Sequence, residues 1–185
     1  MRKKVIIMPL LICLWGGSMI YAATEGQKIA LTINGIGLGE RGVVVDGTAY
    51  LPVRDVANSQ QSIIQWDESG KKISIFKPNV HLILLQDQKM FGNVDRNKQL
   101  NFHVLVQVDN LKTEISDIKV TITDPMNREE LIHAKSVQEK KEDFWFLSKE
   151  HKYNFGVGVY KVRCYMKSGS SNEWSLVSEK QITTI

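Results

Sequence analysis

The chain has 185 residues, of which 43% are hydrophobic and 24% are charged. This length allows one medium domain or two small ones. The composition is that of an ordinary globular protein, which argues against an intrinsically disordered chain and against a membrane protein with several spans. The formal net charge of +4 would favour an anionic partner, but three of the 24 basic residues lie within the first four positions.

The first 22 residues have the layout of a secretory signal peptide. Positions 2–4 are basic, positions 5–15 are apolar, and positions 20–22 end in a small residue suited to cleavage. The alternative is an uncleaved anchor, although the apolar run is short for a spanning helix of about 20 residues and contains a proline and a glycine pair. We therefore expect export to the cell envelope or the outside of the cell, with membrane contact only through an uncleaved leader.

Removal of the leader changes both the charge and the cysteine count. The remaining chain has 21 basic and 20 acidic residues, a net charge of +1, so we expect no nucleic-acid partner. Cys13 is lost with the leader, which leaves Cys164 without an intramolecular disulfide partner. Residues 160–167 alternate, and this pattern predicts Cys164 on the apolar face of a strand, where a thiol acts as a small hydrophobic group. An intermolecular disulfide or a nucleophile is the alternative.

Residues 25–87 are predicted to form one small α+β unit, which opens with two hairpin turns. Alternating apolar residues at 29, 31 and 33 predict a strand that ends at the pair Asn34 and Gly35. The pair Asp46 and Gly47 repeats this turn chemistry, since both central positions of a tight hairpin turn need positive φ.

A helix and a further hairpin complete this predicted unit. Pro52 suits the first position of a helix, the apolar residues at 53, 56 and 57 form its buried stripe, and Asn58 can end it. Trp66 is expected to lie opposite β-branched residues across a hairpin, and so also to cover the helix. Asp67 begins the turn of that hairpin.

Residues 28–77 resemble the copper amine oxidase N-terminal-like domain, also called the stalk domain, which occurs in exported bacterial proteins. The resemblance implies a small α+β fold with an accessory role. Family members usually have a glycine after the helix, whereas residues 59–62 of this chain are Ser-Gln-Gln-Ser. A shorter or remodelled helix end is therefore expected. The motifs that carry the resemblance are Asn34-Gly35, Val45-Asp46-Gly47-Thr48, Leu51-Pro52-Val53-Arg54, Trp66-Asp67 and Lys72-Ile73-Ser74-Ile75.

The oxidase chemistry in the name of this family is not expected here. The four histidines are scattered, with no His-x-His pair, and no Asn-Tyr-acid motif for a quinone cofactor is present. We therefore expect no copper, no other metal and no cofactor. The chain also contains no Gly-x-Ser-x-Gly elbow, so no catalytic residue is assigned and the protein is not expected to be an enzyme.

The second half is predicted to be all-β. Residues 88–98 are polar and are interpreted as a linker, and short alternating segments in 99–185 are typical of an antiparallel immunoglobulin-like sandwich. Tyr160 lies in a Gly-Val-Tyr-Lys-Val segment that resembles a tyrosine corner, in which the hydroxyl bonds to nearby backbone. The fold class is thus a stalk-like α+β domain followed by an all-β sandwich.

Three residues are candidates for binding a ligand. Arg54 could present a guanidinium to an anionic polymer, although pairing with Asp67 or Asp55 is its ordinary role. In residues 143–147 the strand alternation points two phenylalanines one way and Trp145 the other, so Trp145 is exposed if the phenylalanines are buried. Trp174 could serve likewise, and core packing is the alternative for each tryptophan taken singly.

The expected function is that of a non-catalytic binding or spacer module, whose partner is a cell-wall polymer or another exported protein. The alternative is a secreted hydrolase, or an inhibitor of one, acting on wall or protein substrates. Asp and Glu residues number 20, so a pair of catalytic carboxylates depends on their separation in the fold and not on their count.

Overall fold

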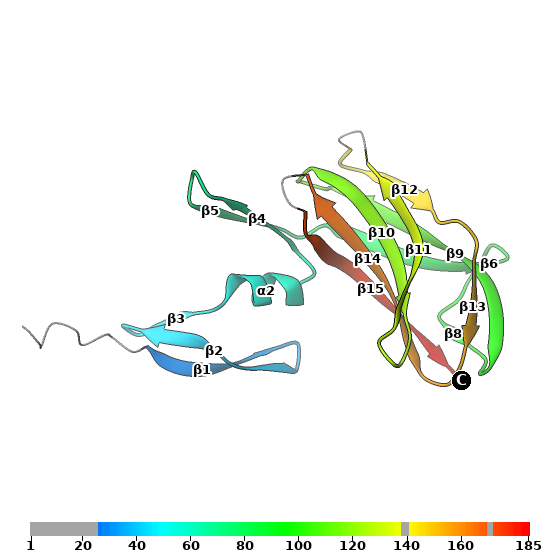
Figure 1. Cartoon of the computed structure of the whole chain (residues 1–185), viewed down its shortest axis with the longest axis horizontal. Helices are drawn as coiled ribbons and strands as arrows, with labels where there is room; N and C mark the ends of the chain where they lie inside the picture. Colours follow the sequence, from blue (N-terminus) through cyan, green and yellow to red (C-terminus); the bar gives the residue numbers. More distant parts are fainter. Residues whose placement is uncertain (1–25, 138–140, 170–171) are drawn as a thin grey trace, which may run out of the picture. The chain divides into compact units, whose positions relative to one another are not determined.

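Most of the described chain is β-strand, with one short helix among the strands (Figure 1). The computed structural model describes residues 26–137, 141–169 and 172–185, and the leader expected at 1–22 lies outside this part. A first compact unit ends at Pro52 and a second begins at Val53. The first unit contains a three-stranded sheet, and the second contains the helix, a hairpin and a β-sandwich.

The three-stranded sheet is a simple meander. Strands β1 (Gln27–Ile33), β2 (Ile36–Val45) and β3 (Thr48–Tyr50) pair antiparallel in that order. Asn34 and Gly35 have φ values of 52° and 78°, and Asp46 and Gly47 have values of 49° and 76°. Both turn pairs therefore have the positive φ values that a tight hairpin turn requires.

Helix α2 (Val53–Ser59) begins directly after Pro52 and ends in a Schellman motif. The N–H of Ser62 donates to the carbonyl of Ala57 at 2.9 Å, and the N–H of Gln61 donates to the carbonyl of Asn58 at 3.0 Å. Gln61, with a φ of 55°, takes the left-handed position that glycine usually occupies in this motif. The expectation that Asn58 ends the helix was wrong because these two bonds carry the turn past it.

A two-stranded hairpin follows the helix. Strands β4 (Ile63–Asp67) and β5 (Lys72–Phe76) place Trp66 opposite Ile73. Asp67 closes the turn by accepting the N–H groups of Ser69 and Gly70 at 3.0 and 3.1 Å, and its bonds to Ser69 and Gly70 lower its pKa. Trp66, expected to cover the helix, keeps 54% of its surface exposed. Ile63 is fully buried in the core of the sandwich.

Two sheets form the sandwich (Figure 1). The first has the strand order β12 (Phe144–Leu147), β9 (Lys98–Asp109), β6 (Asn79–Gln86) and β7 (Lys89–Met90), and β13 (His151–Phe155) also pairs with β9. The second has the order β11 (Glu129–Ser136), β10 (Ile115–Thr123), β14 (Val159–Ser168), β15 (Trp174–Thr184) and β8 (Asn93–Val94). All the pairings described are antiparallel except that of β15 with β8.

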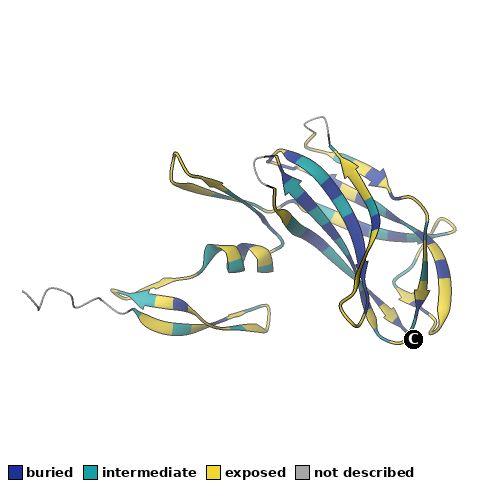
Figure 2. Cartoon of the chain, viewed as in Figure 1, coloured by how far each residue is buried: buried dark blue, intermediate teal, exposed yellow. Residues whose placement is uncertain are grey.

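The core lies between the inner faces of these sheets. Along β9 and β14 every second side chain points inside, and Ile118, Val120 and Ile122 of β10 do the same. The removal of this apolar surface from water stabilises the fold. Figure 2 shows this alternation as dark blue bands of buried residues separated by less buried ones along the sandwich strands. Cys164 is fully buried as predicted, and burial raises the pKa of its thiol well above the ordinary value. The other fully buried residues of these strands are Phe102, Val104, Val106, Val108, Ile118, Val120, Ile122, Val162 and Met166.

The boundary expected between the two halves differs from the structure. The segment 88–98, interpreted as a linker, contains the whole of β7 and β8, which pair with the sandwich strands β6 and β15. Strand β6, expected within the first domain, pairs with β9 through seven residue pairs and buries Leu82 and Leu84 in the sandwich core. The alternation of β6 predicts a strand, but it carries no information about which strand is its neighbour.

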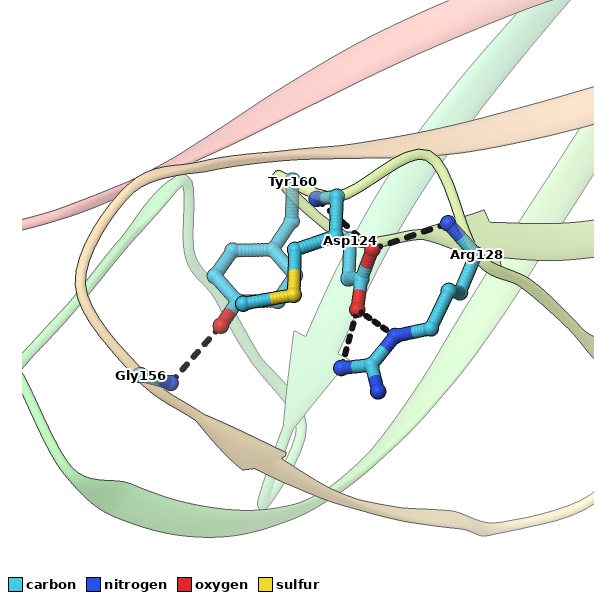
Figure 3. Close-up of polar contacts among 5 residues, drawn as sticks. Asp124, Arg128, Gly156 and Tyr160 are labelled. Atoms are coloured by element: carbon cyan, nitrogen blue, oxygen red, sulfur yellow. Dashed lines mark hydrogen bonds and ion pairs between the residues drawn. The ribbon is translucent and has the colours of Figure 1, made fainter.

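One end of the sandwich is fixed by a corner at Tyr160 (Figure 3). The buried Tyr160 hydroxyl accepts the N–H of Gly156 at 2.7 Å. Nearby, the Asp124 carboxylate accepts the N–H of Arg128 at 2.9 Å and two guanidinium bonds from the same residue at 2.6 Å. These bonds, with that from the N–H of Met126, hold the pKa of Asp124 below its ordinary value.

Candidate binding surface around Trp145

Trp145 points away from the core of the sandwich. Within β12, Phe146 is 7% exposed and Phe144 packs against the core, while Trp145 between them is 71% exposed. Among the described strands, β12 lies at the edge of its sheet and pairs with β9, where Trp145 lies opposite Gln107. Side chains alternate between the two faces of a strand, and Phe144 and Phe146 face the core. Trp145 between them is therefore exposed.

An apolar row lies beside Trp145 on the outer face of the same sheet. Leu147 of β12 pairs with Leu105 of β9, and Leu105 pairs with Ile83 of β6, so the three side chains share one face. Leu147 is 46% exposed, and Leu105 and Ile83 are half-buried. The outer face of an antiparallel sheet is ordinarily polar. An apolar row next to an exposed indole therefore marks a surface suited to interaction.

A shallow hollow of about 490 Å³ lies against Trp145, and we refer to it as the acidic hollow. Its polar groups are the side chains of Gln107, Asp109 and Asp143. The Gln107 amide donates to both carboxylate oxygens of Asp109 at 3.2 and 3.0 Å, and Asp143 accepts the N–H of Asn110 at 2.7 Å. None of its lining residues is Lys or Arg. They are Leu105, Gln107, Asp109, Asp143, Phe144 and Trp145.

A second hollow, of about 430 Å³, also has Trp145 in its wall and has the opposite charge. Its polar lining includes Lys135, Ser136 and Lys141, and we refer to it as the basic hollow. Phe144 also contributes to both hollows. The indole of Trp145 is thus bordered by a site with two carboxylates and a site with two ammonium groups.

The other two candidate residues meet at a different place. Arg54 and Trp174 line one pocket of about 320 Å³, together with Asn58 and Glu173. Arg54 donates to Glu173 at 2.8 Å, a partner different from the Asp67 or Asp55 expected from the sequence, and both side chains of this pair are mostly exposed. Such an exposed ion pair contributes little to stability.

Trp174 is less available than Trp145. Its side chain is 38% exposed, and the Lys119 ammonium lies 4.9 Å from its ring centroid and equally far from that of Tyr165. A protein cation thus already lies against one face of this indole. The structure therefore brings Arg54 and Trp174 together and leaves Trp145 on the other sheet.

The side chains that commonly bind metal ions are not clustered within the described residues. Among residues 26–137, 141–169 and 172–185, no three His, Cys, Asp or Glu side chains lie close enough to hold a metal ion. His133 packs on Phe146, and burial together with Lys149 and Lys135 lowers its pKa. In the same part of the chain, no helix has the length and apolar character needed to cross a membrane.

The polar residues of the acidic hollow are not predicted by any pattern in the sequence. Gln107, Asp109 and Asp143 come from segments more than thirty positions apart, and only the pairing of β9 with β12 brings them together. A signal for the apolar row was nevertheless present in the sequence. Leu105 and Ile83 are apolar at positions that the alternation assigns to the outer face.

No protein-family model matches the chain, and no curated protein matches it significantly.

Proposed function

We propose that the chain is an exported, non-catalytic binding module of the cell envelope or the extracellular space, and that Trp145 is the centre of its binding surface. The observation that carries this proposal is the 71% exposure of Trp145 beside an apolar row on an outer sheet face. Exposed aromatic residues with a polar rim are enriched where proteins bind their ligands. Export is inferred from the leader pattern of residues 1–22.

The two parts of the chain would have different roles in this proposal. The turns at Asn34 and Asp46 are followed by the helix and the β4–β5 hairpin, in the order that the stalk-domain resemblance implies. This order supports an accessory or spacer role for 28–77. The two antiparallel sheets and the bond from Gly156 to Tyr160 support an immunoglobulin-like sandwich. The sandwich would then hold the ligand.

Retention on natural ligands tests the proposal. The chain without its leader is mixed with isolated cell wall and with the secreted proteins of the same cells, and Trp145→Ala is compared with the unaltered chain. We expect one fraction to retain the chain and Trp145→Ala to lose at least about tenfold in retention, since central aromatic residues contribute about 2 kcal/mol or more to binding.

Trp66→Ala is the matched control for this experiment. Trp66 is also an exposed tryptophan on a strand, at 54%, but it lies on the β4–β5 hairpin and lines neither hollow. Its substitution should leave retention unchanged. Equal retention of Trp145→Ala and the unaltered chain would rule out the proposed surface. Turnover of a wall polymer or peptide by the purified chain would favour a hydrolase, and inhibition without turnover would favour an inhibitor.

A further inference from the structure

The acidic hollow combines two kinds of chemistry that few ligands satisfy together. The indole of Trp145, with Leu105 and Phe144, offers an apolar wall. Asp109 and Asp143 add two carboxylates, and no basic residue among the lining residues neutralises them. The hollow therefore suits a ligand with a flat apolar face and a positive charge.

We propose that the ligand is a glycan whose sugar units carry free amino groups, that is, a partly or wholly de-N-acetylated hexosamine polymer. One sugar ring stacks its C–H face on Trp145, and its ammonium group lies against Asp109 and Asp143. This inference rests on the proposed binding role of the same surface and names the class of ligand.

The stacking part follows from the shape of the indole and of the hollow. An exposed tryptophan provides a broad, rigid apolar plane with little conformational entropy to lose, and a pyranose ring has a matching plane of C–H groups. The volume of about 490 Å³ lies within the range of about 300–1,000 Å³ for small-molecule sites. Beyond Trp145, the row of Leu147, Leu105 and Ile83 continues the apolar surface across three strands. A polymer chain could follow it.

The ammonium part follows from the arrangement of charges. A cation between a carboxylate and an aromatic face gains from both, by charge-assisted hydrogen bonds and by attraction to the ring. The Asp109 and Asp143 side chains are held by bonds from Gln107 and Asn110, each of which leaves acceptor positions on the carboxylate. They are thus oriented in advance for a donor.

The basic hollow sets the direction in which such a ligand binds. Lys135 and Lys141 line it, and like charges repel a sugar amine placed there. The amine is therefore directed to the side of Trp145 on which the two aspartates lie. A lysine-rich peptide has the positive charge but lacks the flat C–H face, so we favour the sugar.

Calorimetric titration of the leader-free chain with defined oligomers tests this inference. The probes are glucosamine, N-acetylglucosamine and glucose oligomers of equal length, together with a lysine-rich peptide. We expect the glucosamine oligomer to bind at least about tenfold more tightly than the other three, and its affinity to fall as salt is raised, because the contacts are partly ionic.

Three substitutions divide the interaction into its parts. Trp145→Ala should weaken binding of the glucosamine oligomer about 10- to 100-fold. Asp109→Asn and Asp143→Asn keep the size of the side chain and its accepting oxygen but remove the charge, and each should cost about tenfold. Trp66→Ala should change nothing. A urea midpoint equal to that of the unaltered chain shows that each variant is folded.

Two kinds of result would overturn the inference. If the N-acetylglucosamine or the glucose oligomer bound as tightly as the glucosamine oligomer, the carboxylates would not recognise the amine. Binding of the lysine-rich peptide alone, lost in Trp145→Ala, would replace the glycan by a protein ligand and would leave the proposed surface standing. The proposed surface itself fails only if Trp145→Ala is retained like the unaltered chain in the fractionation described above.

Discussion

Tyr160 shows how one residue can fix a crossing between strands. Its ring contacts those of Tyr153 and Phe155, with centroids 5.7 and 5.0 Å away, and its hydroxyl reaches back four residues to the N–H of Gly156. The ring supplies apolar burial and the hydroxyl satisfies a backbone donor in the loop between β13 and β14. A phenylalanine could perform only the first of these roles.

Tyr160→Phe is therefore expected to lower the free energy of unfolding by about 1–3 kcal/mol, because the N–H of Gly156 loses its partner. Urea denaturation of the leader-free chain measures this change. Tyr165→Phe is the control, since the Tyr165 hydroxyl donates to Glu129 at an exposed position, and it should change stability by less than about 0.5 kcal/mol. Equal effects of the two substitutions would contradict a special role for the corner.

At the scale of single elements, the end of α2 depends on an unfavourable conformation. Gln61 occupies the left-handed region with a φ of 55°, which costs a non-glycine residue roughly 1–2 kcal/mol. The bonds from Ser62 to Ala57 and from Gln61 to Asn58 require this conformation. The same turn leads into Ile63, whose side chain is fully buried, so the helix end also positions the start of β4.

Gln61→Gly should raise the free energy of unfolding by about 0.5–1 kcal/mol, because glycine adopts this φ without steric cost, although it loses more entropy on folding. Thermal unfolding of the leader-free chain provides the measurement. Gln60→Gly is the matched control, since Gln60 has no positive φ and glycine there should be destabilising. A lower stability of Gln61→Gly than of the unaltered chain would show that this turn is not formed as described.

The β4–β5 hairpin marks a limit of strand patterns at this scale. The pairing of Trp66 with Ile73, and of Ile64 with Ile75, follows from the alternation of residues and the length of the turn. Whether a face of this hairpin is covered depends on other segments of the chain. Three of its apolar residues remain about half exposed, namely Trp66, Ile73 and Ile75. Alternation alone therefore predicts which residues share a face, but not which face is buried.

At the scale of the whole molecule, β6 decides where the sandwich begins. It supplies seven residue pairs to β9 and two buried leucines, Leu82 and Leu84, to the core. A sandwich that began at residue 99, as the sequence suggested, would leave β9 with an unpaired edge along these positions. Loss of a buried leucine costs about 2–5 kcal/mol, so the loss of these two is comparable with the roughly 5–15 kcal/mol by which a whole domain is stable.

A fragment of residues 99–185 is therefore expected not to fold, whereas a fragment of residues 53–185 should unfold cooperatively in urea. Circular dichroism and dispersion of amide proton resonances distinguish the two outcomes. The longer fragment contains β6, β7 and β8 and serves as the control. A cooperative transition in the 99–185 fragment would show that the sandwich does not need β6.

Local patterns in the sequence determined the parts of this protein that depend on near neighbours along the chain. Turn and helix-start chemistry predicted the turns at Asn34 and Asp46 and the short helix after Pro52. The two-residue repeat of a strand predicted the strand positions of the sandwich, the burial of Cys164 and the outward direction of Trp145. Only the tertiary structure decided that β6 belongs to the sandwich and that Arg54 meets Glu173. It also brought Gln107, Asp109 and Asp143 to one side of Trp145. These contacts join residues that are distant in sequence. They depend on which strands pair, and backbone hydrogen bonds between strands are much the same for most side chains. No local pattern in the sequence therefore predicts them.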